Sequence, residues 1–296
     1  MPTSETLATD AAAMVTRPRR RWRYAKSGSL ARHLVLLAFM ALALVPIYFM
    51  VVNALKTNAE YAGNELAPPH HLVLSTVHDS LAGGELFRWM LNSLLITAAS
   101  VLISTAVAAC GAYPISLMNW RPGGVLMSVL IALMVVPPIV LVIPLFQMVV
   151  DAHQLNTYQS VIVIYTWLML PFSTFLLATF FATVPRSLVE AARIDGAGTL
   201  RTLRLIVLPL ARPALVTVIV VQALWVWNEV LIAIIFLQQS NLRTLMVGLT
   251  VFSSRYHLNV PIVMAGMLVA TIPMLVLYLV GQRSFIRGLT AGATKG

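Results

Sequence analysis

Residues 190–214 read EAARIDGAGTLRTLRLIVLPLARPA, a polar segment with four arginines that separates two long apolar runs. Gly196 and Gly198 interrupt it near its middle. Charged side chains are costly inside a bilayer, so we expect this segment to lie outside the membrane. Glycine permits a sharp turn of the backbone. The segment is therefore predicted to be a short helix–turn–helix that needs a protein partner.

The composition of the chain is that of an integral membrane protein. Of its 296 residues, 59% are hydrophobic and only 10% are charged, whereas soluble domains carry about 25% charged residues. The single cysteine, Cys110, excludes a disulfide within the chain. Six apolar runs have the length that crosses a bilayer, about 20 residues. They are Leu34–Val52, Ser93–Ile115, Val125–Val150, Val161–Val184, Ala214–Leu237 and Ile262–Val280.

These runs predict an all-α fold, a polytopic membrane protein with a six-helix bundle. Strands of a transmembrane barrel would alternate polar and apolar residues over segments of about ten, and the runs here are longer and apolar throughout. Pro137, Pro138 and Pro144 predict a bend in the third span. The bend would either border a pathway or serve packing alone.

The basic residues alternate with the predicted spans. Sixteen of the 20 lysines and arginines lie on one side: at the two ends of the chain, in the turn after the second span and in residues 184–213. The positive-inside rule places that side in the cytoplasm. A nucleic-acid-binding surface would not follow span number, so the net charge of +10 does not predict a nucleic-acid partner.

The predicted organisation has three parts. Residues 1–32 form a basic, partly disordered cytoplasmic tail, residues 33–281 form the six-span domain, and residues 282–296 form a cytoplasmic C-terminal tail. No apolar stretch or cleavage pattern of a signal peptide precedes Leu34. His70 and His71 lack further ligands at a suitable spacing, so no metal site is predicted.

Local signals predict the first half of the polar loop. Ser187 and Glu190 have the spacing of a capping box, which gives Glu190 a structural explanation. A helix would run over residues 188–194, and Gly196 and Gly198 would form the turn. Asp195 would hydrogen-bond the amides of that turn.

The second half of the loop is predicted to be another helix, over residues 199–207. Pro209 and Pro213 would end it before the fifth span. Arg201 and Arg204 would lie off its apolar face. That face would carry Leu200, Leu203 and Val207.

The loop also matches a known pattern: Glu190-Ala191-Ala192, three residues, Gly196, nine residues, then Ile206-Val207-Leu208-Pro209. It resembles the EAA loop of permease subunits in binding-protein-dependent ABC importers. The resemblance implies that the loop contains the coupling helix, which seats in a cleft of a cytoplasmic ATPase. The residues implied to contact that ATPase are Glu190, Ala191, Ala192, Asp195, Gly196, Ala197 and Pro209.

Similarity to the maltose type of permease covers roughly residues 30–296. It is carried by Asn92-Ser93, Ala112-Tyr113, residues 143–146, residues 155–157 and the tail at residues 288–296. It implies the type I importer fold, the cell membrane (plasma or inner) of a prokaryote, and three kinds of protein partner. These are a second homologous permease, an ABC ATPase dimer and an extracytoplasmic solute-binding protein. In the maltose system the matching tail reaches the ATPase interface; here a frayed terminus is the alternative.

The chain itself is predicted to be a non-catalytic subunit. Its only lysines are Lys26, Lys56 and Lys295, and none of them ends a phosphate-binding loop. We therefore expect no cofactor on this chain, and ATP and Mg²⁺ on the partner ATPase.

The fifth span contains an acidic side chain within an apolar run, in Trp225-Val226-Trp227-Asn228-Glu229. Intramembrane ionisable residues are functional candidates, and Gln222, Trp225 and Glu229 share one helix face. Such a polar and aromatic stripe suits a sugar, and the string resembles the fifth span of carbohydrate permeases. Asn228 and Tyr165 complete the predicted substrate path. A contact between helices is the alternative for Glu229.

The sequence thus predicts the permease subunit of an ATP-driven importer of mono- or oligosaccharides. One alternative is a same-family importer of another solute, such as glycerol phosphate; a phosphate favours basic cavities, and no Lys or Arg lies within the spans. The other is an ion-coupled secondary transporter with Glu229 as its ion-binding acid.

Overall fold

The computed structural model describes the backbone of residues 27–71, 73, 84–118, 120–255 and 259–293, all of it helix, turn or loop. By its internal contacts the chain divides into two units, Met1–Tyr48 and Phe49–Gly296. Within the described residues, four helices are long and apolar enough to cross a membrane, and up to six spans result if each sharply bent helix pair counts as one. The four long helices are α2 (Ser27–Ala54), α5 (Glu85–Leu117), α8 (Tyr158–Phe181) and α15 (Val260–Ala293).

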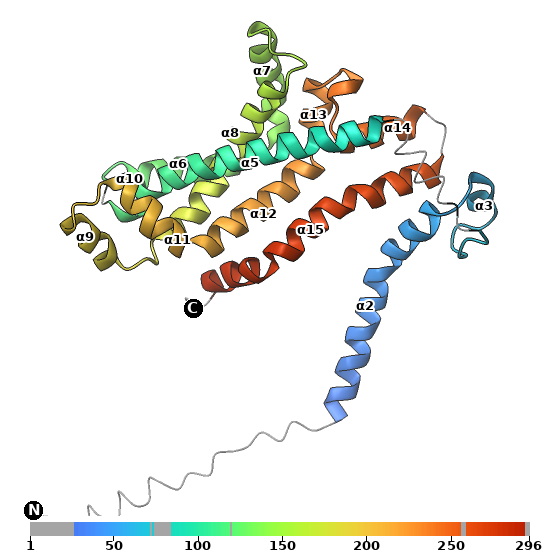
Figure 1. The fold of residues 1–296 in the computed structure, drawn as a ribbon, viewed down its shortest axis with the longest axis horizontal. Coiled ribbons are helices and arrows are strands. Elements are labelled where there is room, and N and C mark those ends of the chain that lie inside the picture. The colour runs from blue at the N-terminus through green and yellow to red at the C-terminus, as the bar shows by residue number, and fades with distance from the viewer. Residues whose placement is uncertain (1–26, 72, 74–83, 119, 256–258, 294–296) are drawn as a thin grey trace, which may run out of the picture. The chain divides into compact units, whose positions relative to one another are not determined.

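Three of these helices and α12 (Arg212–Asn228) form the bundle of the second unit. In Figure 1, α5 lies along α8 and α12, and α12 lies along α15. Small side chains such as Ser93, Ser100 and Ser104 are buried on α5, and small residues let membrane helices approach closely. The helix α15 continues past the predicted end of the sixth span at Val280, so the predicted tail begins as helix.

The third predicted span is broken rather than gently bent. It consists of α6 (Gly123–Met134) and α7 (Pro138–Asp151), whose axes differ by 99°. Pro137 is extended (φ −64°, ψ 133°) because the residue before a proline is forced out of the helical region, and Pro138 has no amide hydrogen for a continuing helix. The helix α7 projects away from α5 in Figure 1.

The fifth predicted span, Ala214–Leu237, is also interrupted, and its prediction as one helix is wrong. The helix α12 ends at Asn228, Glu229 is extended (φ −74°, ψ 129°), and α13 runs over Leu231–Phe236. The apolar sequence gave no breaking residue here. The break depends on hydrogen bonds to the Glu229 side chain, described below.

A loop after α13 closes over the start of α5. The Trp89 indole nitrogen donates to the carbonyl of Ser240 (2.8 Å), and the Asn92 amide donates to the carbonyls of Asn241 and Arg243 (both 2.9 Å). Trp89 is only 4% exposed. A basic–aromatic pair at the start of a span suggests a lipid-facing anchor, but here the loop covers the tryptophan and uses it to satisfy a carbonyl.

The segment between the first two spans contains the short helix α3 (Asn58–Gly63). Thr57 and Glu60 form a capping box at its start. Lys56, just before it, is 1% exposed, and its ammonium donates to Asn53 Oδ1 (3.1 Å) and to the carbonyl of Asn64 (2.9 Å). Buried charges require such partners, so Lys56 holds this segment in a fixed turn.

Gly248, in α14 (Leu245–Arg255), lies directly against the ring of Trp89 in α5. A Cβ at this position would lie 2.1 Å from the Trp89 ring. We therefore expect Gly248→Ala to destabilise the purified protein by about 1–3 kcal/mol, the usual cost of overpacking, measured as loss of thermal stability in detergent. Gly124→Ala is the matched control, because nothing lies within 4 Å of its added methyl. Equal melting temperatures for the two variants would contradict the contact.

Candidate functional site

The first helix of the polar loop is α9, Arg186–Ile194, and the predicted capping box is absent from it. The helix begins directly after Pro185, and no side chain caps its first turn. Pro185 has an extended backbone (φ −57°, ψ 124°) and occupies the position before the helix. Ser187 therefore lies inside the first turn and not at the cap. Glu190 is exposed and does not cap the helix.

The turn after α9 is built on Gly196, as predicted. Gly196 has φ +77°, a conformation that costs other residues free energy. Its amide donates to the carbonyl of Arg193 (3.0 Å), and the next amide, of Ala197, donates to the carbonyl of Ala192 (2.8 Å). This is the Schellman arrangement that ends many helices. Gly198 adopts an ordinary extended backbone (φ −66°, ψ 165°) and is not required for the turn.

The predicted second helix is present in three pieces. They are α10 (Thr199–Thr202), a π-helical turn (Leu203–Val207) and α11 (Leu208–Leu210). Pro209 has no amide hydrogen, and the amide before it, of Leu208, bonds back five residues to Leu203. The axis of the whole segment makes an angle of 79° with α12, so the chain turns sharply before it enters the bundle.

The buried face of this second segment differs in one residue from the prediction. Leu203 and Val207 are buried, but Leu200 is 70% exposed, and Thr202 is buried at 1% exposure. The spacing of the hydrophobic residues correctly predicted that Leu203 and Val207 are buried, but it wrongly included Leu200. Leu200 lies on the exposed side of the segment.

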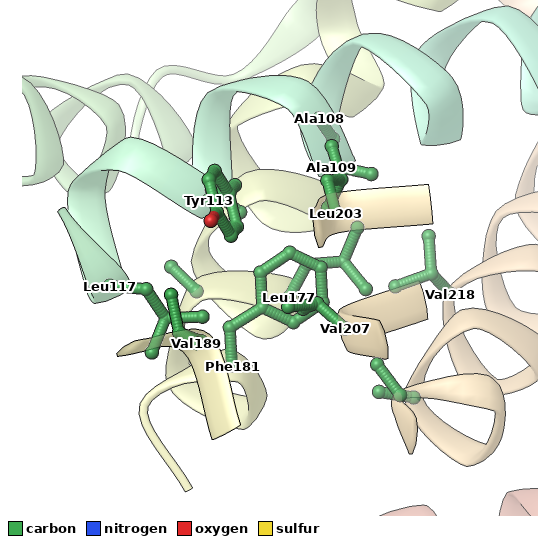
Figure 2. Close-up of a cluster of buried hydrophobic side chains, with 14 residues drawn as sticks. Ala108, Ala109, Tyr113, Leu117, Leu177, Phe181, Val189, Leu203, Val207 and Val218 are labelled. Atoms are coloured by element: carbon green, nitrogen blue, oxygen red, sulfur yellow. The ribbon is translucent and has the colours of Figure 1, made fainter. Parts of the chain in front are cut away.

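Side chains from the loop are part of the bundle core. Val189 of α9, together with Leu203 and Val207, packs among side chains of α5 and α8, as Figure 2 shows. The helix residues around them include Tyr113, Leu117, Leu177 and Phe181. Each fully buried aliphatic or aromatic side chain stabilises by about 1.5–3 kcal/mol. The loop is therefore packed firmly against α5 and α8.

The residues predicted to contact the ATPase lie mostly on the outside of the loop. Glu190, Ala191, Asp195, Gly196 and Pro209 are exposed. Ala197 is partly exposed, whereas Ala192 is buried, at 6% exposure. Among the described residues, the Asp195 carboxylate accepts no hydrogen bond, so its predicted bonds to the turn amides are absent.

Sequence reasoning missed Ile194, the last residue of α9. It is 86% exposed and directly follows Arg193 in the chain. An isolated apolar side chain on a surface is ordinary, but this loop carries two such residues, Ile194 and Leu200, while Val189, Leu203 and Val207 anchor it to the bundle. The signal in the sequence was an isoleucine between charged residues, just before the glycine turn.

A cavity of about 950 Å³ lies among α6, α7, α8 and α12. Its lining is mainly aliphatic and aromatic, with Trp167 and Trp225 among the rings. Its polar side chains are Gln154, Gln159, Ser160 and Gln222, and none of its described lining residues is charged. Ligand cavities commonly combine apolar walls with a few polar groups.

The predicted substrate-path residues are only partly gathered at this cavity. Gln222 and Trp225 line it, whereas Tyr165, Asn228 and Glu229 do not. Gln222 is 5% exposed, and its amide donates to the Met169 carbonyl (3.2 Å) and Ser173 Oγ (3.1 Å), so it also joins α12 to α8.

The remaining two predicted residues lie at the end of α12. The Asn228 amide donates to the carbonyl of Leu224 in its own helix (2.7 Å). The Glu229 carboxylate accepts a hydrogen bond from the Tyr165 hydroxyl (2.5 Å) and others from α13 amides. Glu229 thus makes the contact between helices that was its alternative interpretation. That any of the five residues contacts a substrate stays a prediction.

The left-handed backbone at Gly196 gives a local test of the loop. Gly196→Ala is expected to weaken the Schellman turn by about 1–2 kcal/mol. Hydrogen–deuterium exchange of the amides of residues 195–197 would then accelerate by roughly five- to thirtyfold. Gly198→Ala is the control, because that residue has an ordinary φ and open space around it. Equal exchange in both variants would argue against the turn.

Comparisons with known proteins identify the family. A family model described as "Binding-protein-dependent transport system inner membrane component" matches residues 100–285. The chain is 34% identical to the melibiose/raffinose/stachyose import permease protein MelC of Bacillus subtilis (strain 168), over 93% of this chain and 100% of the relative. It is 30% identical to the trehalose/maltose transport system permease protein MalG of Thermococcus litoralis, over 90% and 98% of the two chains.

Among solved structures, a chain from a bacterial ABC transporter that imports the acidic polysaccharide alginate has a TM-score of 0.78, with 23% identity. The match covers 89% of this chain and 98% of that one, and it shows a shared fold. A loop with the EAA pattern, held by its apolar face against a bundle of membrane helices, agrees with these matches. The chain belongs to the binding-protein-dependent ABC transporter permeases, the inner membrane components of such transport systems.

Proposed function

We propose that this chain is one permease subunit of an ATP-driven importer of mono- or oligosaccharides. The observation that carries the proposal is the loop at residues 186–210, whose tip is exposed while Val189, Leu203 and Val207 are fixed in the bundle core. Relatives named for the import of melibiose, raffinose, stachyose, trehalose and maltose support a sugar as the solute.

The partners follow from this role. The tip of the loop, in the cytoplasm with both chain ends, contacts an ABC ATPase dimer, which binds ATP and Mg²⁺ and performs the hydrolysis. A second related permease completes the pathway, and a solute-binding protein delivers the sugar from outside. The exposed Ile194 and Leu200 supply apolar contact area, and Glu190 and Asp195 supply charge, in a patch of the kind that protein interfaces use.

Transport requires two states of the bundle. Closure of the ATPases moves α9, and the cluster around Leu203 and Val207 passes that motion to α5 and α8. Each state must be favoured by contacts that the other lacks: nucleotide on the inside, and the loaded binding protein on the outside.

The cavity favours a neutral solute with both apolar and polar faces. Trp167 and Trp225 offer ring surfaces for the C–H face of a sugar, and Gln154 and Gln159 offer hydrogen-bonding groups for its hydroxyls. No described lining residue is cationic, which disfavours an anion such as glycerol phosphate. Glu229 already accepts hydrogen bonds from its own chain, which disfavours an ion-coupling role.

Coupling to the ATPase is tested with Ile194→Asp. A buried carboxylate at the tip should weaken the association of the ATPase by at least about tenfold, since unpaired charges are costly in interfaces. The measurement is co-purification of the ATPase with the membrane subunits. Leu66→Asp, which changes an exposed leucine of the segment after the first span, is the control on the opposite side. Loss of the ATPase from the control but not from Ile194→Asp would overturn the assigned orientation.

A second variant addresses the EAA residue itself. Glu190→Ala is expected to leave the complex assembled but to uncouple hydrolysis from uptake in vesicles, because the side chain is exposed at the tip. Uptake at the wild-type rate per ATP hydrolysed would exclude this role for Glu190.

The solute is tested by uptake into proteoliposomes that contain the whole complex. Melibiose, maltose and trehalose are suitable probes, with glycerol 3-phosphate as the competing solute. Uptake should require internal ATP and the binding protein, and should persist after ionophores collapse every ion gradient. Uptake that follows an ion gradient without ATP would refute the proposed function, and uptake of glycerol 3-phosphate alone would refute the sugar.

A further inference from the structure

The hydrogen bonds of Glu229 all point to its own chain. Its carboxylate accepts from the amide of Ile232 (3.1 and 3.0 Å to the two oxygens) and from the amide of Ala233 (3.3 Å). These amides lie in the first turn of α13, where helical partners are lacking. An apolar surrounding makes each unpaired amide costly, so Glu229 stabilises the break between α12 and α13.

A third partner of the same carboxylate lies on α8. The Tyr165 hydroxyl donates to Glu229 Oε2, and the Tyr165 side chain is fully buried. A hydrogen bond to a charged acceptor is stronger than one between neutral groups. Glu229 therefore holds the hydroxyl of Tyr165, and the surrounding packing holds its ring.

Tyr165 in turn contacts the cavity wall. Its ring meets the Trp225 ring edge to face, with centroids 5.8 Å apart and planes at 86°. That is a favoured geometry for aromatic pairs. Trp225 is 37% exposed and lines the cavity, whereas Tyr165 and Glu229 do not. A continuous series of contacts thus leads from the α13 turn through Glu229 and Tyr165 to a ring that borders the cavity.

We propose that Glu229 is a positioning residue for this cavity: through the Tyr165 hydroxyl it fixes the orientation of Trp225. The proposal rests on the proposed function in one respect, that Trp225 is the ring on which a sugar packs. Trp225 is then the contacting group, and Glu229 acts at a distance from the solute. The intramembrane acid orients an aromatic wall rather than binding the hydroxyls of the sugar.

Two roles of Glu229 are separable by substitution. Tyr165→Phe removes the hydroxyl that reaches the carboxylate, but it leaves the α13 amides bonded to Glu229 and keeps the ring against Trp225. Glu229→Gln weakens both sets of bonds. Thr179→Val is the matched control on α8, because it removes an exposed hydroxyl that bonds only within its helix, to the carbonyl of Phe175 (2.8 Å).

The first measurement is ¹⁹F NMR of the full chain in lipid nanodiscs, with fluorotryptophan at its six tryptophans. The loss of one signal in Trp225→Phe assigns that residue. Tyr165→Phe and Glu229→Gln should both shift or broaden the Trp225 resonance, and Thr179→Val should leave it unchanged. A response to Glu229→Gln with none to Tyr165→Phe would reduce Glu229 to a cap of α13 and overturn the proposal. No response to either variant would overturn it as well.

The second measurement titrates melibiose and maltose against the same resonance in the complex assembled with its partner subunits. Tyr165→Phe should raise the half-saturating sugar concentration by roughly three- to tenfold, the ratio equivalent to the usual net contribution of one hydrogen bond. If no sugar changes the Trp225 resonance in the wild-type complex, the proposal that a sugar binds at this ring is refuted. The positioning role is then judged by the first measurement alone. If sugar binds equally well to both proteins, the positioning proposal fails and the proposed function stands.

Discussion

Every backbone amide and carbonyl inside a bilayer must find a partner within the protein. Long helices meet this requirement over most of the described residues, and prolines or a polar side chain accommodate the breaks within two of the predicted spans. Pro137 and Pro138 separate α6 from α7, and the Glu229 carboxylate receives the amides at the start of α13. At the end of the bundle where α5 begins, Trp89 and Asn92 donate to the carbonyls of the covering loop. The cavity borders the break between α6 and α7, where Pro138 is among its lining residues.

The polar loop meets a different requirement, because it must be accessible to a partner and firmly attached to the bundle. Its two faces divide these tasks. Val189, Leu203 and Val207 lie in the core beside Phe181, while Ile194 and Glu190 remain exposed at the surface. A flexible loop with the same exposed residues would absorb a push from an ATPase without moving the bundle. The Schellman turn at Gly196 and the packed inner face give this one the stiffness that the proposed coupling needs.

The cavity and the loop are connected through the same helix. Phe181 and Leu177 of α8 pack on the loop, and Tyr165, four turns earlier in that helix, contacts Trp225 at the cavity. Under the proposed function, a motion of α8 driven from the loop would reach this aromatic wall. Gln222 and Glu229 are polar groups that join α12 to α8, and the proposed sugar contacts are Trp225, Trp167, Gln154 and Gln159.

The sequence by itself determined the features that depend on local chemistry. Six apolar runs, a polar loop and a turn at its glycines follow from composition, charge and backbone sterics. Only the tertiary structure decided which flank of each helix is covered: Trp89 and Ala192 are buried, and Leu200 is exposed. It also decided that Glu229 joins the end of α12 to α8, because the Tyr165 hydroxyl that bonds its carboxylate is 64 residues away along the chain. These features depend on contacts between segments that are far apart in the chain. The periodicity of hydrophobic residues within one segment does not predict such contacts.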